Sequence, residues 1–373
     1  MNILQTIGHT PLVQLTNSTT VDEGRVFLKY ERNNPGGSIK DRPALYIIEQ
    51  AEKLGLLKPG GTIIESSSGN FGISLAMIGA VKGYHVIILV DPKTTSTNLA
   101  LLKSFGAEVI VVTQQDDSGS YHKTRISLAN QMAREIKNSF RPDQCFNVLN
   151  RQAHYKNTAQ EILDDCNNEI DMIITAVSTG GQLGGISKYI KEHMPSVKIV
   201  GVDAEGSAIF GGEAHAYRIP GVGLGWTPSN LDLSLVDCAY KVDDELAFIT
   251  ARALARHEGI LTGPSSGACV AVALKYAQTM GADARIVCIG ADGGERYIHT
   301  LFNDDWMQEQ NFRFNMDICE IKKMALGLRP WSDNPISCAN YRTDLLDALD
   351  VPASTRMFNN ANWMAEGAVV SHV

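Results

Sequence analysis

A glycine-rich loop near the start of the chain carries a lysine that could act as an amine nucleophile. Residues 34–43 read Asn-Pro-Gly-Gly-Ser-Ile-Lys-Asp-Arg-Pro, and the lysine of this loop is Lys40. The positive end of a helix and the nearby Arg42 would both disfavour its ammonium form, which leaves a neutral amine able to attack a carbonyl. An exposed loop lysine is the alternative interpretation of this stretch alone.

A helix is predicted to follow this lysine and to fix its position. Apolar residues recur after the loop at three- and four-residue spacing, at Ala44, Ile47, Ile48, Ala51 and Leu54. Pro43 suits the first turn of such a helix, and Gly55 suits its end. Lys40 therefore lies at a helix entrance, in a loop whose glycines let the backbone approach a ligand closely.

Three more loops that precede predicted helices could bind a ligand. Residues 66–70, Ser-Ser-Ser-Gly-Asn, suit a carboxylate or simply cap a helix. Residues 178–182, Ser-Thr-Gly-Gly-Gln, suit a phosphate or form an ordinary tight turn, and they match neither the G-x-x-x-x-G-K-[ST] nor the G-x-G-x-x-G motif. Residues 263–267 contain Ser265 and Ser266, either of which could be a helix cap.

The composition favours chemistry on small molecules. The chain has 373 residues, 44% of them hydrophobic, and a formal net charge of −8 without a long basic block. These features argue against nucleic acid or an anionic membrane as a partner. We find neither a run of about eighteen apolar residues nor a basic and apolar leader, so we expect a cytoplasmic protein. The seven cysteines include no C-x-x-C pair, so we expect neither a disulfide framework nor a metal site.

Strands and helices are predicted to alternate along most of the chain. Apolar runs predict strands at 10–15, 25–30, 62–65, 85–90, 108–112, 171–177, 198–203 and 285–289. Helical periodicity predicts helices at 73–81, 97–105, 120–137, 243–257 and 266–280, and another that begins near Leu183. Such alternation requires parallel sheets with helices on both faces. The sequence therefore predicts an α/β protein with two doubly wound domains.

We expect a binding cleft between two closely joined domains. The larger domain is predicted to comprise residues 1–39 and 146–311, and a smaller, mobile domain to comprise residues 40–145. The alternation stops near the start of a C-terminal extension, 312–373, which is too apolar for a disordered tail. We expect the extension to contain a short helix at 341–349 and to pack on the body or on a partner subunit.

Together, the lysine loop and the three ligand loops resemble those of the fold-type II pyridoxal-phosphate enzymes, which have the tryptophan synthase β-like fold. The similarity is to the cysteine synthase and cystathionine β-synthase family and spans about residues 5–310. Residues 34–42 resemble the segment that carries the family's Schiff-base lysine, which implies pyridoxal 5′-phosphate as a cofactor bound to Lys40. The resemblance also implies that Asn70 contacts the 3′-oxygen of the cofactor and that Ser265 faces its ring nitrogen.

The resemblance assigns the other ligand contacts to two of the same loops. It implies that the substrate carboxylate is held by Ser67, Ser68, Gly69 and Phe71. It implies that the cofactor phosphate is held by Ser178, Thr179, Gly180, Gly181 and Gln182. Phe71 and Gln182 stand where the family usually has threonine, and residues 291–296 depart from its Pro-x-Ser-Gly-Glu-Arg turn.

The implied reaction is β-replacement on an activated L-serine. In this family the amino acid displaces the lysine, the lysine removes the α-proton, and loss of the β-substituent gives an aminoacrylate to which a second nucleophile adds. A neutral hydroxyl at Ser265 does not hold the ring nitrogen protonated, which favours elimination over transamination. We expect small amino-acid substrates and a homodimer.

Four segments resemble one branch of the family more closely, namely residues 41–44, 90–93, 124–126 and 202–211. That branch, N-(2-amino-2-carboxyethyl)-L-glutamate synthase, joins O-phospho-L-serine to L-glutamate and supplies 2,3-diaminopropionate for siderophores. Arg125 would bind the substrate phosphate, because a guanidinium binds a dianion through two hydrogen bonds. Residues 147–150 lack the Gln-aromatic pair of the family's substrate-side loop. The alternatives are cysteine synthase, using O-acetylserine or O-phosphoserine with sulfide, and a non-catalytic scaffold.

Overall fold

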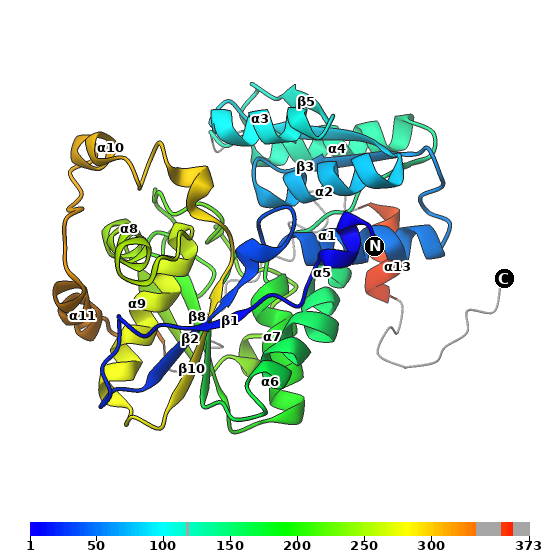
Figure 1. Cartoon of the computed structure of the whole chain (residues 1–373). Helices are drawn as coiled ribbons and strands as arrows, with labels where there is room; N and C mark the ends of the chain where they lie inside the picture. Colours follow the sequence, from blue (N-terminus) through cyan, green and yellow to red (C-terminus); the bar gives the residue numbers. More distant parts are fainter. Residues whose placement is uncertain (117–118, 333–351, 361–373) are drawn as a thin grey trace.

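The computed structural model describes residues 1–116, 119–332 and 352–360 of the chain. Within these ranges the protein forms two lobes, each built around one sheet with helices packed against it (Figure 1). We call them the large lobe and the small lobe, after the sizes of their sheets. The predicted α/β fold is confirmed, and nearly all strand pairs are parallel.

The large lobe contains a sheet with the strand order β1-β2-β10-β7-β8-β9. Its strands are β1 (Leu12–Gln14), β2 (Arg25–Tyr30), β7 (Met172–Ala176), β8 (Lys198–Ala204), β9 (Cys238–Val242) and β10 (Arg285–Gly290). Strand β1 pairs antiparallel with β2, and the other pairs are parallel. Every residue of β7 is buried, as expected for a central strand with helices on both faces.

The small lobe contains a parallel sheet with the strand order β5-β4-β3-β6. Its strands are β3 (Thr62–Ser66), β4 (His85–Val90), β5 (Glu108–Val111) and β6 (Ser139–Phe140). Helix α2 (Asn70–Lys82) lies directly on this sheet, because a Cβ on Gly79 would be only 2.1 Å from the side chain of Val86. The glycine therefore permits close packing of helix and strand.

Helices cover both sheets (Figure 1). Those of the large lobe are α5 (Val148–Ala153), α6 (Ala159–Asp165), α7 (Gly181–His193), α8 (Asp244–Ala253) and α9 (Pro264–Thr279). Those that pack with the small lobe are α1 (Asp41–Lys53), α3 (Ser96–Ser104) and α4 (His122–Glu135), together with α2. In the described parts of the chain, no helix combines the length and the apolar character that a membrane span requires.

Several elements were not predicted from the sequence. Strand β6 has two residues, too few for a periodic pattern, and β9 follows a long irregular stretch. Residues 147–150 were interpreted as a loop, but helix α5 starts there and continues through a π-helical turn, His154–Thr158, into α6. The proposed domain boundaries at residues 40 and 145 stay a prediction. Leu149 lies beyond the second boundary, yet its side chain belongs to the hydrophobic cluster of the small lobe.

The described parts of the C-terminal extension pack on both lobes. Helix α11 (Ile318–Gly327) of the extension lies along the outer side of the large lobe, where it contacts α8 and α9 (Figure 1). Helix α10 (Asp304–Glu309), on the same side, precedes the extension. Helix α13 (Ala353–Asn360) contacts α5, and its fully buried Phe358 meets Phe140 of β6 edge to face. The helix expected at 341–349 lies outside the described residues.

Candidate active site

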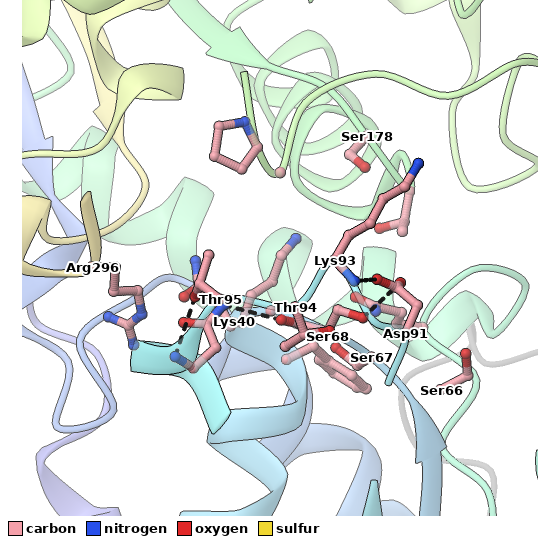
Figure 2. Close-up of a pocket in the computed structure, with 18 of the residues that line it drawn as sticks. Lys40, Ser66, Ser67, Ser68, Asp91, Lys93, Thr94, Thr95, Ser178 and Arg296 are labelled. Atoms are coloured by element: carbon pink, nitrogen blue, oxygen red, sulfur yellow. Dashed lines mark hydrogen bonds between the residues drawn. The ribbon is translucent and has the colours of Figure 1, made fainter. Parts of the chain in front are cut away.

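A cleft of about 530 Å³ separates the loops at the facing edges of the two lobes (Figure 2). The small lobe supplies residues 65–71, the loop after β4, and one face of α4. The large-lobe side supplies Ser178, Thr179 and the loop around Arg218. A narrower cavity shares Lys40 and Asn70 with this cleft and is otherwise lined from the large lobe. The ligand loops predicted from the sequence therefore meet at one place.

Lys40 lines both the cleft and the narrower cavity, directly before α1. Desolvation lowers the pKa of its ammonium group, which favours the neutral amine. The sequence argument ascribed this effect partly to Arg42, and that explanation is wrong. The Arg42 guanidinium is held by Glu31 and Glu161, each at 2.7 Å, and it makes no contribution to the lowered pKa of Lys40.

Asp41 shapes the loop that presents the lysine. Its Oδ2 accepts a hydrogen bond from the backbone N–H of Gly36 at 2.6 Å, and Ser74 of α2 donates to Oδ1 at 2.5 Å. A Cβ on Gly36 would lie 2.3 Å from Oδ1, so the tight approach requires glycine. Burial raises the pKa of Asp41 to about 6. The sequence analysis did not single out Asp41, because its partners become visible only in the folded chain.

The loop predicted to hold a carboxylate lies at the start of α2. Ser67 Oγ accepts a hydrogen bond from the backbone N–H of Gly72 at 3.0 Å. Gly69 is the N-cap residue of the helix, but the bond from Gly72 to Ser67 satisfies an N–H group of the first helical turn, so Ser67 does contribute to capping. Phe71 packs its ring into the core of the small lobe, so the group that it can offer a ligand is its backbone N–H. Helix-start N–H groups suit an anionic ligand.

Asn70 connects the two lobes through an aspartate that the sequence analysis missed. Asn70 Nδ2 donates to Oδ2 of Asp292 at 2.8 Å, and the Tyr297 hydroxyl donates to the same oxygen at 2.6 Å. The other oxygen of Asp292 is buried and has no hydrogen-bond partner among the described residues, and burial raises the pKa of this carboxyl group. The departure of residues 291–296 from the family turn was the available signal for Asp292.

Residues 178–182 form a cup between β7 and α7. Gly180 has a φ of 81°, which favours glycine, and a Cβ on Gly181 would lie 2.2 Å from Asn150 Oδ1. Asn150 in turn donates to Thr179 Oγ1 at 3.0 Å and so supports the cup from behind. The side-chain amide of Gln182 donates a hydrogen bond to the hydroxyl of Thr175 in β7. Asn150 was not predicted, because it belongs to a segment interpreted as a loop.

The two candidate serines before α9 have different surroundings. Ser266 Oγ accepts hydrogen bonds from Thr262 at 2.7 Å and from the backbone N–H of Ala291 at 3.1 Å. Ser265 instead lines the narrower cavity together with Lys40. The N-cap of the helix is Gly263, so the interpretation of either serine as the cap is wrong.

Arg125 lies in the cleft wall beside the carboxylate loop. Its Nη1 donates to Ser68 Oγ at 2.5 Å and lies 3.2 Å from Oδ2 of Asp91, which also accepts from Ser68. Only 9% of the arginine is exposed, so Arg125 is not an ordinary surface arginine, although it does pair with a carboxylate. Burial lowers the pKa of Arg125, and Asp91 opposes that effect.

A second buried arginine lies deeper in the same wall and was not predicted. Arg141 Nη2 lies 3.2 Å from Asp143 Oδ1 and 3.7 Å from Glu65 Oε1. The backbone N–H of Asp143 donates to the other oxygen of Glu65 at 2.7 Å. Burial raises the pKa of Glu65 to about 7 despite the neighbouring guanidinium.

These residues fit a phosphorylated pyridine aldehyde. Lys40, Asn70, Ser265 and the glycine cup all line one narrow cavity. A Cβ at Gly180 or Gly181 would clash with Pro228 or Asn150 behind the cup, so the tight turn of the cup requires both glycines. When bound, pyridoxal 5′-phosphate supplies an electron sink that makes the α-proton of an amino acid acidic. The protein then needs an amine to take that proton and a cavity that excludes water, and Lys40 and the cleft offer both.

Fold and site together define a class of enzyme, and comparison with known proteins agrees. The family model described as "pyridoxal-phosphate dependent enzyme" matches residues 3–292, which is well over half of the chain. The protein therefore belongs to the family of pyridoxal-phosphate-dependent enzymes.

Solved structures narrow the class to enzymes of the cysteine synthase type. A hydrogen sulfide-producing enzyme from Fusobacterium nucleatum is 38% identical, with a TM-score of 0.74, and the match covers 79% of this chain and 99% of that one. An O-ureido-L-serine synthase is 34% identical, with a TM-score of 0.76 over 82% of this chain and 98% of that one. A lysine-to-alanine variant of that synthase with O-ureido-L-serine bound is also 34% identical, with a TM-score of 0.75 over 83% of this chain and 98% of its own. These likenesses support pyridoxal-phosphate-dependent β-replacement, the synthesis of β-substituted alanines, as the class of reaction.

Proposed function

We propose that this enzyme replaces the phosphate of O-phospho-L-serine by the amino group of L-glutamate. The product is N-(2-amino-2-carboxyethyl)-L-glutamate, a precursor of 2,3-diaminopropionate for siderophores. A C–O bond to phosphate breaks at Cβ, a C–N bond forms there, and the amine loses one proton. A homodimer and a cytoplasmic location, both expected from the sequence, belong to the same proposal.

The observation that carries this proposal is the position of Arg125. The guanidinium of Arg125 already donates to Ser68. If the α-carboxylate of a substrate is held at the start of α2, the guanidinium lies within reach of the β-substituent of that substrate. A phosphate dianion would compete with Asp91 for this guanidinium, because it offers more charge and more acceptor oxygens. An acetyl ester carries no charge and would leave the existing ion pair intact.

The proposal gives the remaining residues the roles that the family resemblance implies. The neutral amine of Lys40 takes the α-proton, since desolvation lowers its pKa and it faces the cavity. Ser67, Ser68 and the backbone N–H groups at Gly69 and Phe71 hold the α-carboxylate. The cofactor is held by Asn70 at its 3′-oxygen, by Ser265 at its ring nitrogen, and at its phosphate by Ser178, Thr179, Gly180, Gly181 and Gln182.

Arg125→Ala should discriminate between the two leaving groups. Loss of charge-assisted hydrogen bonds to a dianion should lower kcat/KM for O-phospho-L-serine by about ten- to a hundredfold and largely spare O-acetyl-L-serine. Arg134→Ala is the matched control, because Arg134 is exposed on the same helix. Mass spectrometry of the product formed with L-glutamate identifies the nucleophile. Equal losses on both esters would show that Arg125 has a structural role.

A second candidate is cysteine synthase, with sulfide as the nucleophile. It is favoured by the similarity to a hydrogen sulfide-producing enzyme at 38% identity. Turnover assays with sulfide and L-glutamate on either activated serine separate the two functions. A wild-type enzyme that prefers O-acetyl-L-serine and sulfide would replace the proposal by this alternative.

A further inference from the structure

The cleft is cationic although the whole chain is acidic. Its lining contains the cationic residues Lys93, Arg125, Arg141, Arg218 and Arg296. The carboxylates in the same lining are Glu65 and Asp91, whereas the chain has a formal net charge of −8. A cleft whose charge opposes that of the rest of the molecule concentrates anionic ligands. The positive charge of the cleft therefore suggests that its ligands are anions.

Most of these cations already have a partner or a role. Arg125 lies 3.2 Å from Asp91, and Arg141 lies 3.2 Å from Asp143. Arg296 donates to the backbone carbonyl of the lysine loop at 2.6 Å. Two cations remain after these assignments.

The remaining two are Lys93 and Arg218, which come from opposite lobes. Both side chains are exposed, and within the described residues neither lies within 4.0 Å of a carboxylate oxygen. Figure 2 shows Lys93 extending from the loop after β4 across the cleft, toward the side that carries Ser178. Two cations without a salt bridge among the described residues thus line one cleft from its two sides, although the charge of Arg218 also acts on the nearby Asp244 carboxylate.

The backbone around each cation is anchored, so neither side chain is placed by a loose loop. The N–H of Lys93 donates to Asp91 Oδ1 at 2.9 Å. The N–H of Arg218 donates to both carboxylate oxygens of Asp244, at 2.8 and 2.9 Å. Asp244 begins α8, so this loop is tied to the rigid part of the large lobe. The backbone from which each cation extends is therefore fixed on its wall of the cleft.

We propose that Lys93 and Arg218 form an anion subsite for the carboxylates of the second substrate. This inference rests on the proposed function and extends it, because it assigns an acidic amino acid as the nucleophile and names the residues that select it. Sulfide and uncharged nucleophiles need no such pair. A dicarboxylate held from both walls would also join the two lobes while its amine attacks Cβ.

Charge removal should affect the second substrate and spare the first. Lys93→Met and Arg218→Met keep the apolar stems and remove the charges. Each should raise the KM for L-glutamate about tenfold, and the double variant should raise it further, while the KM for O-phospho-L-serine changes less than about twofold. L-Glutamine, which lacks the side-chain charge, should respond less than L-glutamate. Lys103→Met, at an exposed lysine of α3, is the matched control.

The outcomes separate this inference from the proposed function. An unchanged KM for L-glutamate in both single variants, or an equal rise for both substrates, would overturn the subsite. If the wild-type enzyme makes no adduct with L-glutamate, the proposed function fails, and the subsite is judged by calorimetric titration with glutarate, an unreactive dicarboxylate. Glutarate binding that weakens at least tenfold in the double variant supports an anion subsite, and equal binding by both proteins contradicts it.

Discussion

Glu65 illustrates how burial changes the chemistry of single residues in this protein. It is 1% exposed at the end of β3, where it faces Arg141 and receives the backbone N–H of Asp143. Desolvation outweighs these favourable contacts and raises its pKa to about 7 from an ordinary value of 4.5. The same cause lowers the pKa of Lys40. From residue type alone, both Glu65 and Lys40 would be expected to be charged. Burial shifts each of them toward its neutral form.

Glu65 should make stability depend on pH in a defined window. Its folded-state pKa is raised, so the native state holds a proton that the unfolded state releases between pH 4.5 and about 7. Stability from this group is therefore present below pH 4.5 and is lost as the pH rises through about 7. Glu65→Gln removes the titration. Relative to this variant, the free energy of unfolding of the wild-type protein should fall by about 1–3 kcal/mol between pH 4.5 and 8. Urea unfolding midpoints measure the difference, and parallel pH profiles would contradict it.

Helix α13 is the element that the sequence analysis could least anticipate. It lies far along the chain from β6 and α5, yet it packs next to both (Figure 1). Its Asn359 accepts from the backbone N–H of Val148 and donates to the carbonyl of Phe146, each at 2.9 Å. These two residues follow Cys145, which lines the cleft. Helix α13 therefore supports the segment around Phe146 from the side away from the cleft.

Phe358→Ala should release this helix. The buried ring meets Phe140, and its removal should destabilise the protein by up to about 3 kcal/mol, limited by the free energy with which the helix docks. Hydrogen exchange of residues 353–360 should become faster, and the segment around Phe146 should lose protection. Met357→Ala is the control, because Met357 is 43% exposed on the same turn. Equal exchange in the two variants would show that the ring does not hold the helix.

At the scale of the whole molecule, the site is divided between two lobes. Residues 66–70, which we propose to hold the substrate carboxylate, lie on the small lobe, and residues 178–182, which we propose to hold the cofactor phosphate, lie on the large lobe. The present contacts between the lobes include the bond from Asn70 to Asp292 and the tilted ring contact of His122 with Trp226, at 5.8 Å between centroids. An amino acid bound at Ser67 and Ser68 would add attraction across the cleft and favour closure.

Substrate should therefore make the molecule more compact. O-Phospho-L-serine added to a Lys40→Ala variant, which cannot complete the reaction, should reduce the radius of gyration by about 0.5–1 Å, because closure excludes water from the cleft. Small-angle X-ray scattering with and without the ligand measures this change, and inorganic phosphate serves as the control ligand. Superimposable scattering curves would argue against closure.

Local patterns in the sequence determined the α/β class, the order of most strands and helices, and the loop that carries Lys40, because hydrophobic periodicity and turn chemistry act over a few residues. The tertiary structure decided which loops meet. Asn70 and Asp292 are 222 residues apart in the chain, and Asn150 supports Thr179 from an unpredicted helix. The burial of Lys40 was also decided by the tertiary structure, since the desolvation that lowers its pKa depends on packing by distant segments. The presence of Lys93 and Arg218 in one cleft lining has the same origin, because they come from different lobes that face each other only in the folded chain.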